Sequence, residues 1–249
     1  MKRIATAIFL LASAAQAGIT YRMENVTKGV RPRTFAGIAK IDAGKSRFEV
    51  TRNDSSKIFE TGSVILSSTG KNVMTVLNPA KKTYYVIDLD EIGKVLQEAQ
   101  QQLRPFLNAQ KPTIAVKGDG DGGIIEGFPT RKWIVTIATK DSANLTMQVW
   151  TTDKIPADAA DAFQNSEMAG GTPLTEALRV VRKQMTGFPL KSITTTKMNV
   201  GGSSTSVTSD MKVTQVRTTN FPPSTFAMPA GYKKVDSPID AMLGAVGAR

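Results

Sequence analysis

The sequence predicts an α+β domain, in which helices cover one face of a curved antiparallel β-sheet. Two observations predict this class. Short segments that favour strands follow one another at intervals of about ten residues, with Gly, Asn, Asp and Pro between them, as in an antiparallel meander. Two longer segments then carry apolar residues at helical spacing, and they supply the cover that an antiparallel sheet with one apolar face needs. The 249 residues, 41% of them hydrophobic, suit one domain with a substantial core.

The first half of the chain supplies most of the predicted meander. The turn Asp42-Ala43-Gly44-Lys45 places Asp and Gly where a tight turn needs them, so it predicts a hairpin. Similar turns at 69–72 and 78–81 separate the next strands. The predicted strands of this half are 19–26, 34–41, 46–51, 63–68, 73–77 and 83–89.

Helical spacing appears in two places. The first predicted helix runs from Asp90 to Ala109, with Pro105 kinking its last turn. The second comprises 157–168 and a segment that starts at Thr172 and Pro173, which suit the N-cap and first helical positions. The apolar residues of these helices are Ile92, Val95, Leu96, Ala99, Leu103, Phe106 and Leu107, then Leu174, Ala177, Leu178, Val181 and Met185. Further strands are predicted at 113–117, 131–139, 145–152, 191–200 and 205–218, and a short helix at 238–246.

The N-terminus has the pattern of a secretory signal peptide. Lys2 and Arg3 precede an apolar run from Ile4 to Ala15, and Ala15-Gln16-Ala17 fits a small-x-small cleavage site. We expect residues 1–17 to be the signal peptide and 18–249 one domain, periplasmic or secreted, with cleavage between Ala17 and Gly18. Because no Cys follows the cleavage site, we expect no lipid anchor, and no later segment is long enough to span a membrane. A buried N-terminal helix is the alternative.

Composition argues against most catalytic chemistry. The chain has no Cys and no His, which excludes disulfides, thiolate nucleophiles, His ligands and a Ser-His-Asp triad. We therefore expect a protein that is not an enzyme, with no catalytic residues, no cofactor and no metal. The run from Gly118 to Gly123 matches G-x-G-x-x-G, but no helix pattern follows it, so a turn between strands is predicted. A weak Ca²⁺ site through Asp119 and Asp121 is the alternative.

The net charge of +11, or +9 without the signal peptide, is spread along the chain. Nucleic-acid-binding proteins concentrate basic residues on one face and interleave aromatic residues, whereas only 6% of this chain is aromatic. We expect no nucleic-acid partner. Attraction to anionic lipid or polysaccharide through the basic surface stays open.

Strand alternation identifies candidate ligand-binding residues. Period-two spacing places alternate apolar residues of the strands at 83–89, 131–138 and 145–152 on one face. If that face stays partly open under the helices, it can hold an acyl chain or a hydrophobic peptide; otherwise it is an ordinary filled core. Trp150 falls on the opposite, polar side of its strand and pads a turn or belongs to an exposed patch. The candidate lining residues are Tyr85, Ile87, Trp133, Val135, Met147 and Val149.

Several short motifs together resemble a known family. They are Tyr21-Arg22-Met23, Lys45-Ser46-Arg47-Phe48-Glu49, Asn78-Pro79-Ala80-Lys81-Lys82-Thr83-Tyr84-Tyr85, Gly127-Phe128-Pro129-Thr130-Arg131, Val149-Trp150-Thr151-Thr152-Asp153 and Phe226-Ala227-Met228-Pro229-Ala230-Gly231-Tyr232. From Tyr21 to Lys234 the chain is similar to an uncharacterised family of exported bacterial proteins, distantly similar to the lipoprotein carriers LolA and LolB and the regulator RseB. Some relatives carry a Cys after the Gly-Phe-Pro turn, where Thr130 and Arg131 stand in this chain.

The resemblance implies a half-barrel with helices on its concave side and a role in binding lipidated or hydrophobic partners. Two hypotheses follow from the sequence. One is a periplasmic carrier or sensor of a lipid, a lipoprotein or another hydrophobic ligand. The other is a non-catalytic protein with a filled core, which binds an envelope protein through its basic surface. The oligomeric state is not predicted.

Overall fold

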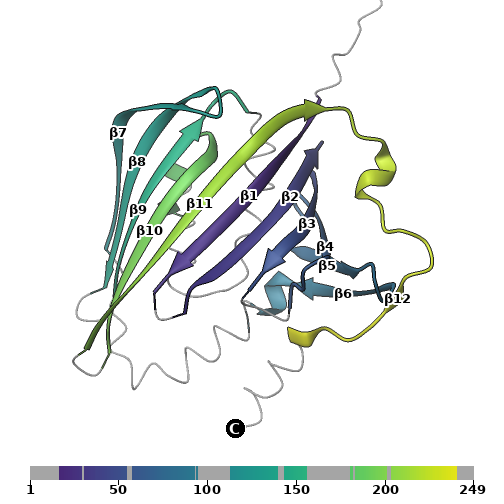
Figure 1. Ribbon diagram of the computed structural model, residues 1–249. Helices are drawn as coiled ribbons and strands as arrows, with labels where there is room; N and C mark the ends of the chain where they lie inside the picture. Colours follow the sequence, from purple (N-terminus) through teal and green to yellow (C-terminus); the bar gives the residue numbers. More distant parts are fainter. Residues whose placement is uncertain are drawn as a thin grey trace, which may run out of the picture.

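The computed structural model describes residues 17–29, 31–54, 58–92, 94, 113–139, 143–155, 180–181, 183–200 and 203–239. They form one sheet of twelve strands, in the order β12-β6-β5-β4-β3-β2-β1-β11-β10-β9-β8-β7 (Figure 1). The strands are β1 Gly18–Lys28, β2 Arg33–Asp42, β3 Lys45–Asn53, β4 Val64–Ser68, β5 Val73–Asn78, β6 Thr83–Asp88, β7 Thr113–Ile125, β8 Phe128–Thr139, β9 Ala143–Thr152, β10 Phe188–Val200, β11 Ser203–Thr219 and β12 Lys233–Lys234.

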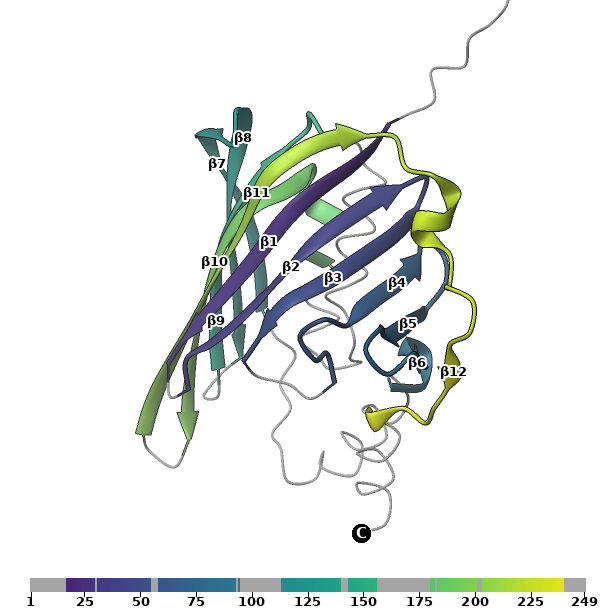
Figure 2. The same cartoon turned by 45° about the vertical axis from the view of Figure 1, so that its right-hand side comes forward.

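Most neighbours in the sheet are also neighbours in sequence. The exceptions are β1, which pairs with β11 in the centre, and β12, which pairs with β6 at one edge. Every pairing is antiparallel except that of β12 with β6. The sheet is therefore two meanders joined through β1 and β11, with β7 as the opposite edge (Figure 2).

The predicted meander is confirmed. Each strand expected from 19–26 to 83–89 corresponds to one of β1 to β6. The β2–β3 hairpin turns at Ala43 and Gly44, whose φ angles are 46° and 71°. Two successive positive φ angles define the turn whose twist suits a two-residue hairpin, and Gly adopts them without a Cβ clash.

The turn expected at Gly118–Gly123 is wrong. These residues lie inside β7, and the turn into β8 comes later, at Glu126 and Gly127, with φ angles of 50° and 81°. The glycines instead accompany register shifts between Gly118 and Asp121 and between Asp121 and Gly123. Gly in a strand allows the bulge conformation as readily as it allows a turn, and the local sequence does not distinguish the two.

The expected α+β class is wrong as well. The described residues are nearly all β, with one four-residue 3₁₀ helix at Pro223–Phe226 and isolated helical turns near 89–94, 180–184 and 238–239. In this part of the chain no helix longer than such a turn covers the sheet, although Val181 of the turn at 180–184 packs against Val135, Ile137 and Leu145, and Ile92 packs against the cluster on β3 to β6. Residues 95–109 and 157–179 of the two expected helices, and 240–246 of the short one, lie outside the described residues. The structure takes its class from the strands, which run longer than predicted at β7, β10 and β11.

Contacts between distant strands identify the concave face. Ile125 and Phe128, at the β7–β8 turn, pack against a cluster formed by β1, β2, β10, β11 and Ile155. The Gln215 N–H also donates to the Glu126 carboxylate over 2.7 Å. The edge of the sheet therefore curls over the face that carries this central cluster. Its buried members are Ile19, Tyr21, Ala39, Ile41, Ile155, Phe188, Leu190, Met211 and Val213.

The convex face has a smaller core under the C-terminal segment. Val64, Leu66 and Leu77 are buried there, with Tyr84 and Tyr232 packed against them. Arg47 donates to the Thr225 carbonyl over 3.5 Å, which links β3 to the 3₁₀ helix. This packing carries the chain across the sheet to its edge, where β12 joins β6.

Candidate ligand-binding face

The concave face carries an apolar row across six strands. Cross-strand pairing places Tyr85 beside Val76, then Ile65 and Phe48, and the row ends at Ala39 and Tyr21. Residues directly opposite one another on antiparallel strands point to the same face. Period-two alternation along 83–89 therefore assigned the face of Tyr85 correctly.

All six predicted lining residues lie on the concave face, but in two separate groups. Tyr85 and Ile87 belong to a cluster on β3 to β6, where Ile87 is 2% exposed. The other four form a patch on β8 and β9, which we call the β8–β9 patch: Trp133 lies opposite Val149, and Val135 opposite Met147. Val135 is 0% exposed, whereas Trp133 and Met147 are partly exposed.

A hydroxyl-rich strand separates the two groups. On β10, Ser192 lies opposite Val149, Thr194 opposite Met147 and Thr196 opposite Leu145. These three side chains are partly exposed on the concave face. The apolar concave face is therefore interrupted by hydroxyl side chains on β10. Alternation did not predict this, because it shows which residues of one strand share a face but not which strand lies beside it.

The β8–β9 patch ends in a polar pocket of about 460 Å³. Trp133 donates from its indole N–H to the Thr151 hydroxyl over 2.9 Å, and the Arg131 guanidinium lies 5.7 Å from the Trp133 ring centre. Arg131 and Thr151 also line the pocket. Its other lining residues are Gly120, Asp121, Pro129, Thr130, Asp153 and Lys154.

Arg131 and Thr151 were not among the predicted site residues. The signal was present, because each lies two residues from a predicted lining residue and so shares its face. A search for apolar residues alone stops where the strand becomes polar. The arrangement places an apolar surface beside two cations and two carboxylates, which is the chemical pattern of a site for an amphiphile.

Tyr85 is a titratable residue inside the apolar cluster on β3 to β6. Its hydroxyl donates to the Ile58 carbonyl. Burial raises the pKa of Tyr85 to about 12, and the Glu60 carboxylate acts in the same direction. Neither effect favours the phenolate, so the side chain serves packing rather than proton transfer near neutral pH.

We expect Tyr85 to titrate late. Because its folded pKa exceeds the unfolded value of about 10, its contribution to stability is complete below pH 10 and is lost as the pH rises toward 12. An alkaline absorbance titration should show a phenol ionising near pH 12, absent in Tyr85→Phe and retained in Tyr232→Phe. A titration curve that Tyr85→Phe leaves unchanged would contradict the assignment.

Trp150 lies on the convex face, as its strand position predicted. The ammonium groups of Lys132 and Lys191 lie 5.6 Å and 4.8 Å from its ring centre, from the strands on either side. Lys132 also pairs with Asp119 over 2.9 Å. Asp119 therefore has a cation as its neighbour, while Asp121 accepts from the Gly123 N–H over 2.8 Å. Within the described residues, no group of three acidic side chains could hold a metal ion.

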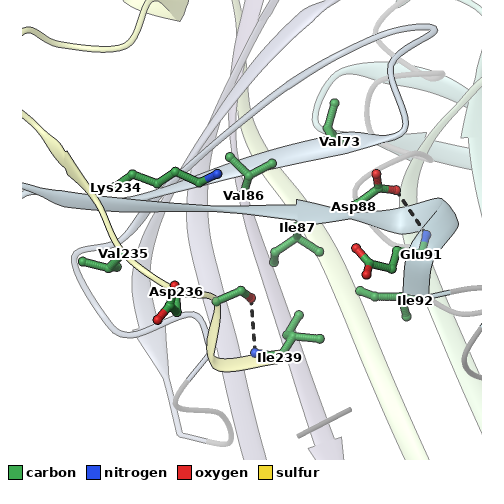
Figure 3. A pocket seen from close by; sticks show the side chains of 11 residues that line it. Val73, Val86, Ile87, Asp88, Glu91, Ile92, Lys234, Val235, Asp236 and Ile239 are labelled. Atoms are coloured by element: carbon green, nitrogen blue, oxygen red, sulfur yellow. Dashed lines mark hydrogen bonds between the residues drawn. The ribbon is translucent and has the colours of Figure 1, made fainter. Parts of the chain in front are cut away.

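A second pocket, of about 280 Å³, opens at the opposite end of the sheet, beside β6 (Figure 3). It lies between β6 and residues 234–239 and includes Ile87. Its lining residues are Val73, Val86, Ile87, Asp88, Glu91, Ile92, Lys234, Val235, Asp236, Ser237 and Ile239. The sequence predicted a helix beginning at Asp90, and it gave no reason to place residues 234–239 beside that position.

The described fold is therefore a curved, mainly antiparallel sheet with an apolar concave face and a pocket at each end. The chain belongs to the family described as Domain of unknown function (DUF4412), whose model matches residues 38–232. This agrees with the resemblance to an uncharacterised family. No curated protein matches the sequence.

Solved structures show distant similarity. An uncharacterized conserved protein from Thermus thermophilus has a TM-score of 0.43 and 10% identity, over 88% of this chain and 90% of that chain. A LolA superfamily protein from Nitrosomonas europaea has a TM-score of 0.34 and 8% identity, over 85% and 90%. A putative outer membrane lipoprotein-sorting protein domain from Vibrio parahaemolyticus has a TM-score of 0.31 and 12% identity, over 86% and 90%.

Among the described residues, none of the helical segments has the length and apolar character needed to cross a membrane.

Proposed function

We propose that this chain is an exported, non-enzymatic binding protein of the cell envelope that holds the acyl chain of a lipid or lipoprotein on its concave face. The β8–β9 patch carries this proposal. There, Arg131 and Thr151 follow Trp133 and Val149 on the same face of β8 and β9, and both line the pocket. An acyl chain would lie along the patch, and its polar head would enter the pocket.

The burial of the patch sets a condition on binding. Val135 and Val149 are 0% and 3% exposed, so a ligand reaches them only after the chain uncovers them. Trp133 and Met147 are partly exposed and offer the first contact. Each methylene of a ligand buried there contributes about 0.8 kcal/mol, from which the cost of opening is subtracted.

Export is part of the same proposal. β1 begins at Gly18, the residue that would follow the predicted cleavage, and Ile19 is already 2% exposed. Cleavage after Ala17 would therefore leave every residue of β1 in place. A mass for the protein from the periplasmic fraction that starts at Gly18 would support export, and one that includes residues 1–17 would contradict cleavage.

The second candidate is a protein with a filled core that acts through its basic surface. The low exposure of Val135, Val149 and Ile87 favours it, since these residues need no ligand to cover them. Binding of an envelope partner through exposed charges would weaken steeply as the salt concentration rises. Partner binding that salt leaves unchanged would contradict this alternative.

A mild substitution in the patch separates the two candidates. Met147→Gln keeps the side-chain length but places an amide on the apolar face, and we expect uptake of a fluorescent fatty acid to fall about 5- to 20-fold because the amide is desolvated. Thr146→Gln is the matched control, because Thr146 is exposed on the other face of β9. Equal uptake by both variants and the parent chain would contradict binding at the patch.

A further inference from the structure

The edge of the sheet at β6 is only partly paired. β12 contributes two residues, with Lys233 opposite Thr83 and Lys234 opposite Tyr84. The Val235 N–H then donates to the Tyr84 carbonyl over 2.9 Å, and residues 236–239 leave the strand. β6 itself continues to Asp88.

Val86 therefore presents backbone groups at an open edge. In a strand, the N–H and C=O of alternate residues point to the same side. The carbonyls of Lys82 and Tyr84 bond to the β12 side, so the N–H and C=O of Val86 point there too. In the described part of the chain they have no hydrogen-bond partner. Unpaired edge groups of this kind are a template for another strand.

The pocket beside β6 adds side-chain recognition to this edge. Its apolar residues come from β5, β6, the following helical turn and the C-terminal segment: Val73, Val86, Ile87, Ile92, Val235 and Ile239. Val235 is 42% exposed, which is unusual for a large apolar side chain in this structure. A volume of about 280 Å³ suits one or two apolar side chains rather than a long acyl chain.

The rim of the pocket is acidic although the chain is basic. Asp88, Glu91 and Asp236 are exposed there, and Lys234 is the one cation among the described lining residues. Asp88 accepts the N–H groups of Asp90 and Glu91 over 2.9 Å and 3.1 Å, and the contact with Glu91 is drawn in Figure 3. No ion pair engages these three carboxylates within the described residues. The local charge of −2 contrasts with +11 for the whole chain.

We propose that the β6 edge binds a short, extended, basic peptide segment by strand addition. The peptide backbone pairs with the N–H and C=O of Val86, one apolar side chain enters the pocket, and adjacent Lys or Arg side chains contact Glu91 and Asp236. Main-chain pairing supplies affinity in such complexes, and the pocket supplies specificity. The site is separate from the β8–β9 patch and does not rest on acyl-chain binding.

The experiment uses the full chain and labelled peptides of alternating Lys and Val, read by fluorescence anisotropy. Three peptides separate the contributions: the Lys-Val peptide, a Glu-Val peptide of the same length, and a Lys-Val peptide N-methylated at every residue, so that neither edge can donate. Because N-methylation removes strand-pairing donors and keeps every side chain, it tests strand addition directly. We expect the Lys-Val peptide to bind and both others to bind at least about tenfold more weakly.

Variants locate the site on the protein. The double substitution Glu91→Gln with Asp236→Asn should weaken binding about 3- to 10-fold, as expected for two exposed charges, and the loss should shrink in high salt. The control is Glu24→Gln, which removes an exposed acid from β1. Val86→Pro removes the outward N–H of Val86 without removing a ladder bond to β5, and should abolish binding.

Peptide N-methylation keeps the test decisive if Val86→Pro fails to fold. Equal binding of the methylated and unmethylated peptides would overturn strand addition. Equal binding of the Glu-Val peptide would overturn recognition of a basic segment. If the chain self-associates at the same concentration and binds no peptide, the β6 edge pairs with a second copy of the chain. This result would also overturn the proposal.

Discussion

Replacing Phe188 with Ala should lower the free energy of unfolding by about 3–5 kcal/mol, the range found for large aromatic residues in well-packed cores. Phe188 is 0% exposed and lies at the start of β10, in the central cluster. Its ring meets that of Tyr21 edge to face, with centres 5.2 Å apart and planes at 72°. The substitution removes this contact and leaves a cavity where β1, β10 and β11 meet.

Urea-induced unfolding, followed by circular dichroism, measures this effect. The control is Phe221→Ala, because Phe221 is partly exposed at the end of the sheet and should cost much less. If the two substitutions lowered the free energy of unfolding equally, the packing of Phe188 in the central cluster would contribute no more than that of Phe221. An effect of Phe188→Ala below about 1 kcal/mol would also show that the curled edge does not close over the central cluster.

Replacing Val135 with Asp should abolish uptake of an acyl ligand. A carboxylate at a position with 0% exposure loses its hydration, and it either displaces the apolar ligand or takes up a proton. The same burial lowers the free energy of unfolding by about 3 kcal/mol or more. Both effects have the same origin, because the side chain faces the concave side, where its opposite neighbours are the apolar Val116 and Met147.

Thr136→Asp is the matched control for this variant. Thr136 is the next residue of β8, is exposed and points to the convex face, so a carboxylate there stays hydrated. Uptake is measured with a fluorescent fatty acid at a temperature where circular dichroism shows both variants folded. Normal uptake by folded Val135→Asp would place the ligand elsewhere.

The sequence pattern predicted the strands well because alternation and turn preference depend on local physics. Alternation along β6, β8 and β9 assigned Tyr85, Trp133 and Met147 to one face, and turn residues such as Ala43-Gly44 located the hairpin. Gly118–Gly123 was misassigned, since glycine permits a bulge and a turn equally. The expected α+β class was wrong because long helices were taken to cover the apolar face. In the described residues the sheet curls over that face, and only short helical turns pack against it, through Ile92 and Val181.

Long-range contacts could not be read from the sequence. Nothing local indicates that Lys233 and Lys234 pair with Thr83 and Tyr84, about 150 residues earlier in the chain. The β6 pocket depends on that pairing, so its residues could not be assembled in advance. The separation of Ile87 from Val135 likewise follows from strand order, which places eight strands between β6 and β8.

Native mass spectrometry of the protein purified from its own envelope is the decisive test of acyl binding on the concave face. Organic extraction of the same sample identifies any lipid that dissociates. We predict an acyl species near one per chain, reduced in Met147→Gln and unchanged in Thr146→Gln. A ligand-free mass that begins at Gly18, obtained repeatedly under gentle conditions, would contradict acyl binding and leave the filled core as the better description.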